Sequence, residues 1–434
     1  MSKTNPARGM RDFLPADVRK REYVIGIIKE VYESYGFEPL ESPAVENIET
    51  LMGKYGEEGN QLIFKILKRG EKLRESLESG EFRELADLAL RYDLTVPLAR
   101  VVANNRNELP KFFKRYQIQP VWRADRPARG RFREFYQCDV DAIGSKSVLV
   151  EAELIAAVSE ILGRLGFNDF IIRVNHRELL SSMIAEAGID PDKASDALVA
   201  LDKLDKIGRD GVRAELLERG IVESATSRFL TYFDNDGQTV NLPANQDLNK
   251  LFALINETKY REHVKPDPSL ARGLSYYTGT IMEINVPDLA GSLGGGGRYD
   301  GLIGMFGKEQ IPACGFSLGL ERILVVMDER GMFPPEIAES NPADVMVTIW
   351  DEETIAESLK LANELRNQGL RVTVYPEADK LGKQVKYADS IKVPYVCVLG
   401  ESELAESKVM LKNMRSGEQV KLDRKMVSKT IRPT

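Results

Sequence analysis

The residues best suited to chemistry in this chain are arginines concentrated in one short stretch. Between Lys111 and Arg133 there are eight basic residues against one acid, Asp125. Two of them, Arg123 and Arg131, flank a loop between two β-like runs. The planar guanidinium group matches phosphate oxygens in a bidentate way. Arginines converging from both sides of a strand–loop–strand therefore suit an extended anion such as a triphosphate, with a charged surface strand as the alternative.

A polar strand face and a pair of tyrosines could bind a second kind of group. Gln137 and Asp141 are four residues apart in the returning run, so both lie on one face of a strand. An amide and a carboxylate there would bind a cationic or donor-rich group. Further on, Arg272 precedes Tyr276 and Tyr277, whose hydroxyls on aromatic rings suit a planar, hydrogen-bonding ligand. Ordinary packing of the tyrosines is the alternative.

Two glycine-containing segments follow. The run GGGGRYDG, residues 294–301, permits close approach of a ligand to the backbone and permits positive φ. We interpret it as functional, with a mobile loop as the alternative. In GFSLGLERI, Gly319 precedes a helix that opens with Glu321 and Arg322. This arginine could reach a phosphate, or the two residues could form a simple surface pair.

Metal or nucleophile chemistry based on histidine or cysteine has little support. Neither of the two histidines, His176 and His263, belongs to an HxxxH or HExxH pattern, so we interpret both as surface or structural residues. The three cysteines lie far apart without a CxxC pair, which argues against a disulfide framework and a thiolate zinc site. Catalysis must therefore rest on other groups.

Composition predicts a multidomain globular protein. A chain of 434 residues favours two or three domains, and 43% hydrophobic with 29% charged residues is ordinary for a soluble protein. No apolar run reaches the roughly eighteen residues of a membrane span, and the N-terminal residues lack the apolar stretch of a signal peptide. We therefore expect a cytoplasmic protein. The net charge of −7 disfavours nucleic-acid binding, but the basic stretches 111–133 and 408–434 could hold phosphates locally.

The elements that position the polar residues can be read from hydrophobic periodicity. Amphipathic spacing predicts helices over Asp17–Tyr35 and Glu151–Leu165, each followed by a glycine. Alternation predicts that residues 111–124 and 132–144 form an antiparallel strand pair, with Pro120 at a bend or an edge.

The middle of the chain changes character. Residues 178–262 read as an inserted, mostly helical module, with helices expected over Ala194–Lys206 and Asp210–Arg219. After it, Leu270–Val286 is rich in aromatic and β-branched residues and is expected to be strand-like.

The last part of the chain, residues 341–434, predicts a separate α/β unit. Helices are expected over Glu352–Asn367 and Leu381–Ile391, and a hairpin turning at Ser416–Gly417. The apolar runs between the helices predict a parallel βαβαβ sheet. Those runs are residues 343–350, 370–376 and 394–400. The unit has neither a Walker A sequence nor GxGxxG, so it is not an obvious nucleotide binder.

Taken together, these segments resemble histidyl-tRNA synthetases over nearly the whole chain. LESPAVE, with Pro43, is similar to class II motif 1, VWRADRPARGRFREFYQCDVD to motif 2 and GFSLGLERI to motif 3. LARGLSYYTG and GGGGRYDG resemble the two signatures of the histidine enzymes, and RYDLTVPLAR, residues 91–100, a further family segment. The histidine signatures, in order between motifs 2 and 3, are the most specific part of the likeness.

The resemblance implies an α+β fold. It implies a class II catalytic domain with an antiparallel β-sheet over residues 1–177 and 263–335, a helical insertion domain over 178–262, and a C-terminal α/β anticodon-binding domain over 341–434. It also implies a homodimer formed through the motif 1 region.

The implied activity is histidine–tRNA ligase. ATP, with Mg²⁺, activates L-histidine to histidyl-adenylate with release of pyrophosphate, and histidine then passes to the 3′ end of tRNA(His). The implied alternative is a catalytically silent regulatory subunit of histidine biosynthesis. Such relatives lack the C-terminal domain and lose arginines of the site, whereas this chain has Arg123, Arg272 and Arg322.

The resemblance also assigns residues to roles. In the histidine site Asp93, Thr95 and Gln137 would hold the α-ammonium group, and Asp141 and Tyr277 the imidazole nitrogens. The other residues implied there are Leu94, Tyr276 in the pocket wall, Arg123, and Arg272 between the substrate carboxylate and the α-phosphate. Those implied for ATP are Arg123 and Arg322 on the phosphates, Phe135 stacked on adenine, Asp125 and Arg131. Glu321 is a candidate magnesium ligand. Two residues depart from the family pattern: Ser275, where an acid is common, and Ala128 in the motif 2 loop.

Overall fold

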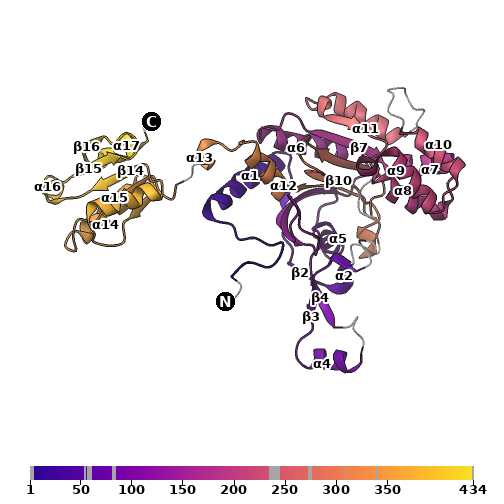
Figure 1. Ribbon diagram of the computed structural model, residues 1–434, viewed down its shortest axis with the longest axis horizontal. Coiled ribbons are helices and arrows are strands. Elements are labelled where there is room, and N and C mark those ends of the chain that lie inside the picture. The colour runs from indigo at the N-terminus through magenta and orange to yellow at the C-terminus, as the bar shows by residue number, and fades with distance from the viewer. Residues whose placement is uncertain are drawn as a thin grey trace. The chain divides into compact units, whose positions relative to one another are not determined.

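The chain folds into two units, each with its own core. Contacts divide it into Met1–Phe333 and Pro334–Thr434 in the computed structural model (Figure 1). The structure describes residues 4–52, 55, 61–80, 85–233, 245–271, 276–307, 309–338 and 341–432.

An eight-stranded sheet forms the centre of the first unit. Its order is β1-β5-β6-β11-β10-β9-β7-β8, antiparallel from β5 to β7, with a parallel strand at each end. The strands, in sheet order, are β1 (Glu38–Pro39), β5 (Phe113–Trp122), β6 (Glu134–Ile143), β11 (Ala313–Gly319), β10 (Gly294–Arg298), β9 (Thr280–Asn285), β7 (Ile171–His176) and β8 (Val264–Pro266). The antiparallel sheet expected for the catalytic domain is thus present.

Three helices pack with this sheet: α1 (Pro15–Ser34), α6 (Leu149–Arg164) and α12 (Leu320–Glu329). The two helices expected from hydrophobic spacing are α1 and α6, displaced by about two residues at their starts. Gly36 follows α1 with φ of 76°, as a helix stop requires. On β6, Cys138 and Val140 are fully buried. Because strand residues alternate between faces, the polar residues of β6 occupy the other face.

A smaller sheet projects from the first unit (Figure 1). Its order is β2-β4-β3. Its elements are β2 (Val45–Asn47), α2 (Ile48–Leu51), β3 (Lys65–Leu67), α4 (Glu71–Glu78) and β4 (Ala86–Leu90). Helix α5 (Thr95–Asn104) follows β4 and packs its apolar face into a core that also contains Tyr276 and Tyr299. This core joins segments that are more than 250 residues apart, from Leu51 to Ala313.

The expected strand pair is formed by β5 and β6, and Pro120 behaves as an edge residue. Strand β1 pairs with β5 only at Arg115 and Tyr116, so the ladder on that side ends before Pro120. The carbonyl oxygen of Pro120 instead accepts a hydrogen bond from Arg91 Nε at 2.8 Å. Within the range Leu270–Val286, expected to be strand-like, β9 occupies Thr280–Asn285, the described residues 270–271 and 276–279 are not in a strand, and residues 272–275 lie outside the described part of the chain. Tyr276 is buried among the core side chains rather than paired in a ladder.

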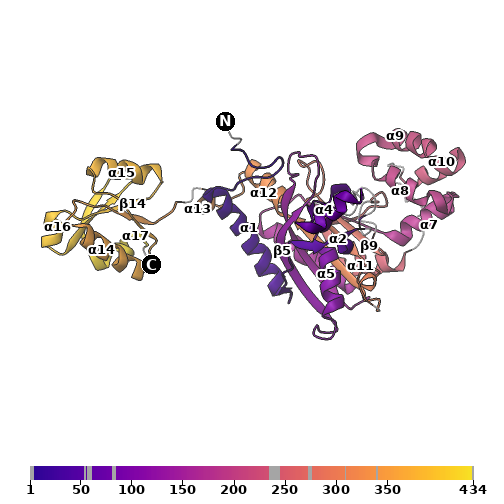
Figure 2. The same ribbon diagram turned by 90° about the horizontal axis from the view of Figure 1, so that it is seen from below.

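Helices that follow β7 gather in one cluster (Figures 1 and 2). They are α7 (Arg177–Ala187), α8 (Ala194–Leu201), α9 (Leu204–Glu218), α10 (Glu223–Thr231) and, beside α6, α11 (Gln246–Asn256). A single helix over Ala194–Lys206 is wrong, because α8 ends before Asp202 and α9 starts at Leu204. Gly208, at φ 67°, then kinks α9, and the helix expected over Asp210–Arg219 is its second part. Whether the cluster is an independent domain stays a prediction.

The second unit is built on a five-stranded sheet in the order β13-β12-β14-β15-β16. The first three strands are parallel, as the βαβαβ pattern predicts, and β15 and β16 add an antiparallel hairpin with Gly417 at φ 75° in its turn. The strands are β12 (Val345–Val347), β13 (Val372–Val374), β14 (Tyr395–Val398), β15 (Lys408–Asn413) and β16 (Gln419–Asp423). The helices are α13 (Pro335–Ala338), α14 (Ile355–Asn367), α15 (Leu381–Ser390), α16 (Glu401–Ala405) and α17 (Val427–Ile431). Within the described part of the chain, no helix combines the length and apolar character that a membrane crossing needs.

Candidate active site

The polar face of β6 forms the floor of the candidate site. Gln137, Asp139 and Asp141 alternate with buried apolar residues and are themselves no more than 8% exposed. Their partners on β5 are Gln119, Gln117 and Arg115, in that order, and on β11 they are Gly319, Ser317 and Gly315. Strand β11, which is distant in sequence from β6, thus supplies a row of small residues on one side of these polar side chains, and the neighbouring strand β5 supplies polar residues on the other.

Glycines make this floor hollow. A Cβ atom at Gly315 would lie 1.9 Å from Asp141 Oδ1, and one at Gly297 would lie 2.5 Å from the Thr280 carbonyl oxygen and 2.9 Å from Tyr277. Close approach of neighbouring protein groups to Gly297 is therefore found, while approach of a ligand to the glycine run stays a prediction. Residues 294–297 form β10, a strand paired on both sides, and none uses the positive φ that glycine permits. The alternative of a mobile loop is excluded by the same pairing.

A cavity of about 200 Å³ lies over the floor. It is lined by Thr95, Asp139, Asp141, Tyr277, Gly295, Tyr299, Gly315, Phe316 and Ser317. Three of these, Thr95, Asp141 and Tyr277, are residues that the family resemblance assigns to histidine. The structure brings them together from three separate segments of the chain.

Asp93 and Tyr276 meet at one wall of the site. Asp93 accepts hydrogen bonds from the hydroxyl of Tyr55 at 2.8 Å, the hydroxyl of Tyr276 at 3.3 Å and the backbone N–H of Val96 at 3.1 Å. Burial raises the pKa of this carboxyl, and the three hydrogen bonds act in the opposite direction. Leu94, at the N-terminus of α5, has a fully buried side chain, so only its backbone could meet a ligand.

Asp141 is held from two sides. Its Oδ2 is 2.8 Å from Arg115 Nη2, and its Oδ1 accepts a hydrogen bond from the hydroxyl of Tyr299. Arg115 is fully buried and also donates to Gln117 Oε1 at 3.1 Å. Burial raises the pKa of Asp141 while the charge of Arg115 lowers it. The carboxylate is therefore fixed in direction before any ligand arrives.

Gln137 is only partly satisfied, and Asp141 Oδ2, although it lies 2.8 Å from Arg115 Nη2, also lacks a hydrogen-bond partner among the described residues. Gln137 Nε2 donates to Ser317 Oγ at 2.9 Å and reaches Asp139 Oδ1 only at 3.5 Å. Gln137 Oε1 is buried and finds no hydrogen-bond partner among the described residues. Buried polar atoms are rarely left unpaired without a reason, so this oxygen is suited to a ligand donor such as an ammonium group.

Arg123 stands where β5 ends and is fixed by backbone and rings. Its Nε donates to the Tyr92 carbonyl oxygen at 3.0 Å, and its Cζ lies 4.2 Å from the ring centroid of Tyr92 and 5.3 Å from that of Phe135. Phe135, at the start of β6, is thereby part of the same cluster. An arginine held through Nε keeps the rest of its guanidinium group for an anion.

The loop between β5 and β6 is organised by Asp125. Its Oδ1 lies 2.7 Å from Arg131 Nη2, and its carbonyl oxygen accepts from Arg133 Nε at 3.0 Å. The Arg131 side chain is 51% exposed, whereas Arg123 is bound deeper. Arg131 and Asp125 therefore shape the loop that approaches the site, and their contact with ATP stays a prediction.

Helix α12 brings Glu321 and Arg322 to the other side of this loop. Gly319 caps the helix, as expected, and a Cβ at Gly130 would lie 3.2 Å from Arg322 Cγ. Arg322 donates through Nη1 to the Ser292 carbonyl oxygen. Glu321 is 3% exposed, with one oxygen 2.8 Å from Arg21 Nη1 and the other 2.9 Å from the backbone nitrogen of Tyr136. Both oxygens have protein partners, which does not favour a magnesium contact at Glu321.

The residues named from the sequence thus fall into three places. Most of those implied for histidine surround the cavity, and Arg123 and Phe135 form a cluster at the end of β5. Arg322 lies beside the loop at Gly130. Arg272, like Ser275, lies outside the described residues, so its place stays a prediction. The structural reading of the histidines is confirmed: His176 caps α7 and His263 stacks on Phe170.

Four residues of the site were not singled out from the sequence: Arg115, Asp139, Tyr299 and Ser317. Asp139 could have been, because the alternation that places Gln137 and Asp141 on one face places Asp139 between them. Arg115 could not, since its pairing with Asp141 depends on the register of β5 against β6.

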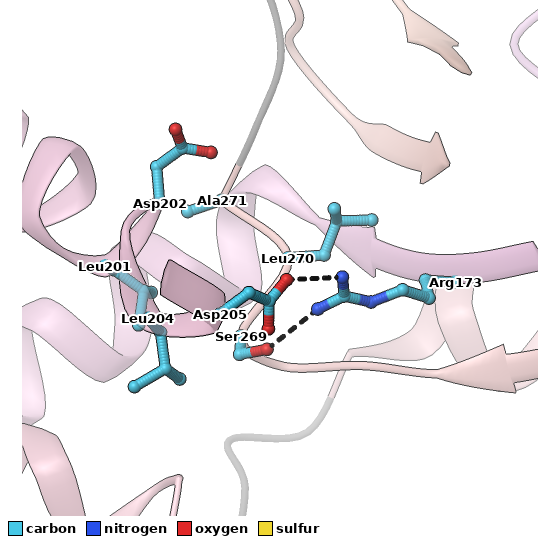
Figure 3. A pocket seen from close by; sticks show the side chains of 8 residues that line it. All are labelled: Arg173, Leu201, Asp202, Leu204, Asp205, Ser269, Leu270 and Ala271. Atoms are coloured by element: carbon cyan, nitrogen blue, oxygen red, sulfur yellow. Dashed lines mark hydrogen bonds and ion pairs between the residues drawn. The ribbon is translucent and has the colours of Figure 1, made fainter. Parts of the chain in front are cut away.

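A second cavity, of about 220 Å³, lies between β7 and the helices α8 and α9 (Figure 3). Arg173 crosses it, with Nη1 2.8 Å from Asp205 Oδ2 and Nη2 3.2 Å from Ser269 Oγ. The remaining lining residues are Leu201, Asp202, Leu204, Leu270 and Ala271. Its polar groups bond to one another, so we interpret this place as a joint between the helical cluster and the sheet.

Known proteins match both units of the chain. A sequence model described as histidyl-tRNA synthetase matches residues 9–323, and one described as an anticodon binding domain matches residues 344–434. The chain is 42% identical to a histidine–tRNA ligase of Cytophaga hutchinsonii, covering 97% of this chain and 98% of the relative. It is 44% identical to one of Porphyromonas gingivalis, covering 96% and 97%. A crystal structure of histidyl-tRNA synthetase from Nostoc sp. PCC 7120 superposes with a TM-score of 0.79 at 30% identity, over 99% of each chain.

Proposed function

Because the chain belongs to the histidyl-tRNA synthetase family, we infer that it is a histidine–tRNA ligase, a class II aminoacyl-tRNA synthetase. It activates L-histidine with ATP and transfers the histidyl group to tRNA. The single observation that carries this inference is near-full-length identity of about 40% to histidine–tRNA ligases. The alternative of a regulatory subunit is not favoured, since the second unit matches an anticodon binding domain.

We propose that histidine occupies the cavity over β6. Its α-ammonium group would lie against Gln137 Oε1, the buried oxygen without a described partner, with Asp93 and Thr95 nearby. Its imidazole ring would lie toward Tyr277 and the carboxylates. A side chain with two ring nitrogens satisfies these buried groups, whereas an apolar amino acid would leave them unpaired and be rejected.

ATP would bind on the arginine side of the site. We propose that Arg123 contacts the α-phosphate, that Arg322 contacts the γ-phosphate, and that the ring of Phe135 stacks on adenine. The support is the position of Arg123 beside Phe135 and of Arg322 beside the β5–β6 loop. The carboxylate of histidine would attack the α-phosphate in line. Positioning and fixed positive charge at Arg123, with Arg272 as a further candidate, would supply most of the acceleration.

Magnesium is expected to accompany ATP, but the part of the chain that the structure describes offers it no preformed site. The described residues contain no cluster of three or more metal-ligating side chains. Mg²⁺ commonly binds through substrate phosphates, waters and only one or two carboxylates. We therefore propose that the ion is carried mainly by the nucleotide, and we assign no step to a metal held by the protein.

The second unit and the motif 1 segment are assigned to macromolecular partners. We propose that residues 341–434 contact the anticodon of tRNA(His), with the basic stretch 408–434 facing phosphates. We propose a homodimer formed through residues 40–46, where Val45 is 39% exposed. Its substrates are those of translation, so we place the enzyme in the cytoplasm.

Histidine-dependent exchange of labelled pyrophosphate into ATP tests the activity directly. We expect exchange with histidine and with none of the other nineteen standard amino acids, because only histidine pairs the buried groups on both ring nitrogens. Exchange that is absent over a range of magnesium concentrations would contradict the proposal and support the regulatory alternative.

A further inference from the structure

The N-terminal segment, residues 7–13, lies against the loop between β5 and β6. The carbonyl oxygen of Gly9 accepts a hydrogen bond from the backbone N–H of Arg133 at 2.8 Å. The segment turns at this point, because the backbone N–H of Met10 donates to the carbonyl oxygen of Ala7 at 2.9 Å. The loop that approaches the proposed ATP site is thus backed by residues from the beginning of the chain.

Gly9 needs to be glycine for two reasons. Its φ of 83° lies in the left-handed region, which a residue with a side chain rarely adopts. An added Cβ atom would also lie 2.8 Å from Arg133 Cγ and 2.9 Å from Pro127 Cγ. Both atoms belong to the β5–β6 loop, and neither is the far end of a flexible side chain. A side chain at position 9 would therefore push the loop away from the N-terminal segment.

Arg133 connects Gly9 to the proposed ATP site. Its carbonyl oxygen accepts a hydrogen bond from the backbone N–H of Arg123 at 2.9 Å, and its Nε donates to the carbonyl oxygen of Asp125 at 3.0 Å. The backbone of Arg123 is therefore joined to Gly9 by two hydrogen bonds that share one residue. Since Arg123 is proposed to contact the α-phosphate, a shift of the loop at Arg133 would move that guanidinium group.

A second contact holds the same segment. Arg11 Cζ lies 3.4 Å from the ring centroid of Phe132, in a cation–π contact with the loop. Phe13 lies beneath the guanidinium group of Arg21 on α1, whose Cζ is 4.2 Å from the ring centroid. Arg21 in turn pairs with Glu321 on α12 at 2.8 Å. The N-terminal segment is therefore tied to the loop at one end and to α1 and α12 at the other.

Resting on the function proposed above, we propose that Gly9 and Arg11 are positioning residues for the activation of histidine by ATP. They hold the β5–β6 loop, so that Arg123 is in place when ATP binds, and neither residue needs to touch the nucleotide. A loop that had to be ordered during binding would weaken the affinity for ATP, and its charge would be less well aimed at the α-phosphate. The floor of the histidine cavity lies on β6 and β11, so histidine binding should depend much less on this segment.

The experiment measures pyrophosphate exchange with full-length variants. We expect Gly9→Ala to lower kcat/KM for ATP about 10- to 100-fold, the range for a catalytic group misplaced by a distant change, and to leave the KM for histidine near that of the parent. Arg11→Ala should lower kcat/KM for ATP about 2- to 5-fold, the size of one exposed cation–π contact. Arg11→Lys keeps a cation over Phe132 and should recover part of that loss.

Gly36→Ala is the matched control. Gly36 also has positive φ, 76°, but nothing lies within 4 Å of an added Cβ, and it follows the far end of α1. This variant strains the backbone in the same way, so it should lower the melting temperature and leave kcat/KM for ATP unchanged.

Three outcomes would overturn the proposal. They are a parental kcat/KM for ATP in Gly9→Ala, a rise of the histidine KM as large as the loss for ATP, and the same loss for ATP in Gly36→Ala. Arg11→Ala changes an exposed side chain, so it decides the question if Gly9→Ala does not fold, and a parental value there counts equally against the proposal. Absence of exchange in the parent would instead refute the proposed function, so the two failures are distinguishable.

Discussion

The two sides of the active site use charge in opposite ways. On the histidine side, Arg115, Asp139 and Asp141 are almost completely buried and lie on paired strands of the central sheet. On the ATP side, Arg123 and Arg131 lie in or beside a loop, and Arg131 is half exposed. Buried charges must be paired by the fold itself, whereas exposed ones can rearrange around a flexible polyphosphate. The proposed histidine site is therefore built into the core, and the proposed ATP site into the rim.

This contrast predicts that substitutions on the proposed histidine side mainly lower the free energy of unfolding. Arg115→Met removes the partner of Asp141 Oδ2 and leaves a buried carboxylate unpaired. We expect the free energy of unfolding to fall by about 3–5 kcal/mol, measured by urea titration. The double variant Arg115→Met/Asp141→Leu removes both charges and should regain most of that loss. A double variant less stable than Arg115→Met would contradict the buried-pair interpretation.

Substitutions on the proposed ATP side should slow adenylate formation and leave the fold intact. Arg123→Ala removes a positive charge held against Tyr92 and Phe135. We expect the barrier to adenylate formation to rise by about 2.7–4 kcal/mol, the range for one preorganised charge, measured by pyrophosphate exchange. The free energy of unfolding should be nearly unchanged. The control is Arg164→Ala, which removes an exposed ion pair with Glu30 and should alter neither the exchange rate nor the free energy of unfolding. An exchange rate near that of the parent in Arg123→Ala would remove Arg123 from the mechanism.

The smallest expected effect comes from Gly315, the glycine that lies against Asp141 in the floor of the cavity. In Gly315→Ala the new Cβ would lie 1.9 Å from Asp141 Oδ1, so Asp141 or the strand must move. We expect a stability loss of about 1–3 kcal/mol, as for other overpacked sites, together with a raised histidine KM and an unchanged ATP KM. Gly163→Ala makes the same change in helix α6, where nothing lies within 4 Å, and should leave both KM values unchanged. Equal rises in both KM values at Gly315 would mean that the two sides are not separable.

The errors in reading secondary structure have physical causes. In the range Leu270–Val286, the described residues 276–279 precede β9, which begins at Thr280, and Tyr276 packs its ring into the core rather than joining a ladder. The glycine run permits positive φ, but residues 294–297 form a regular strand and do not use it. A side chain at these positions would meet neighbouring strands or Tyr277, and those distances depend on how β9, β10 and β11 assemble.

The sequence by itself determined what local chemistry dictates. Alternation placed Gln137 and Asp141 on one face, the 3.6-residue period gave α1 and α6, and the βαβαβ pattern gave the parallel part of the second unit. The motifs carried the resemblance to the family that the comparisons then showed. These features depend on residues close together in the sequence, so the sequence pattern alone can predict them.

Only the tertiary structure decided which charges face each other. Arg115 looked like one member of a basic stretch, but the register of β5 against β6 buries it opposite Asp141. Tyr299 reaches Asp141, and Tyr276 reaches Asp93, across more than 150 residues of sequence. Whether a buried carboxylate is satisfied depends on such distant donors, because the low dielectric of the interior makes each missing partner costly.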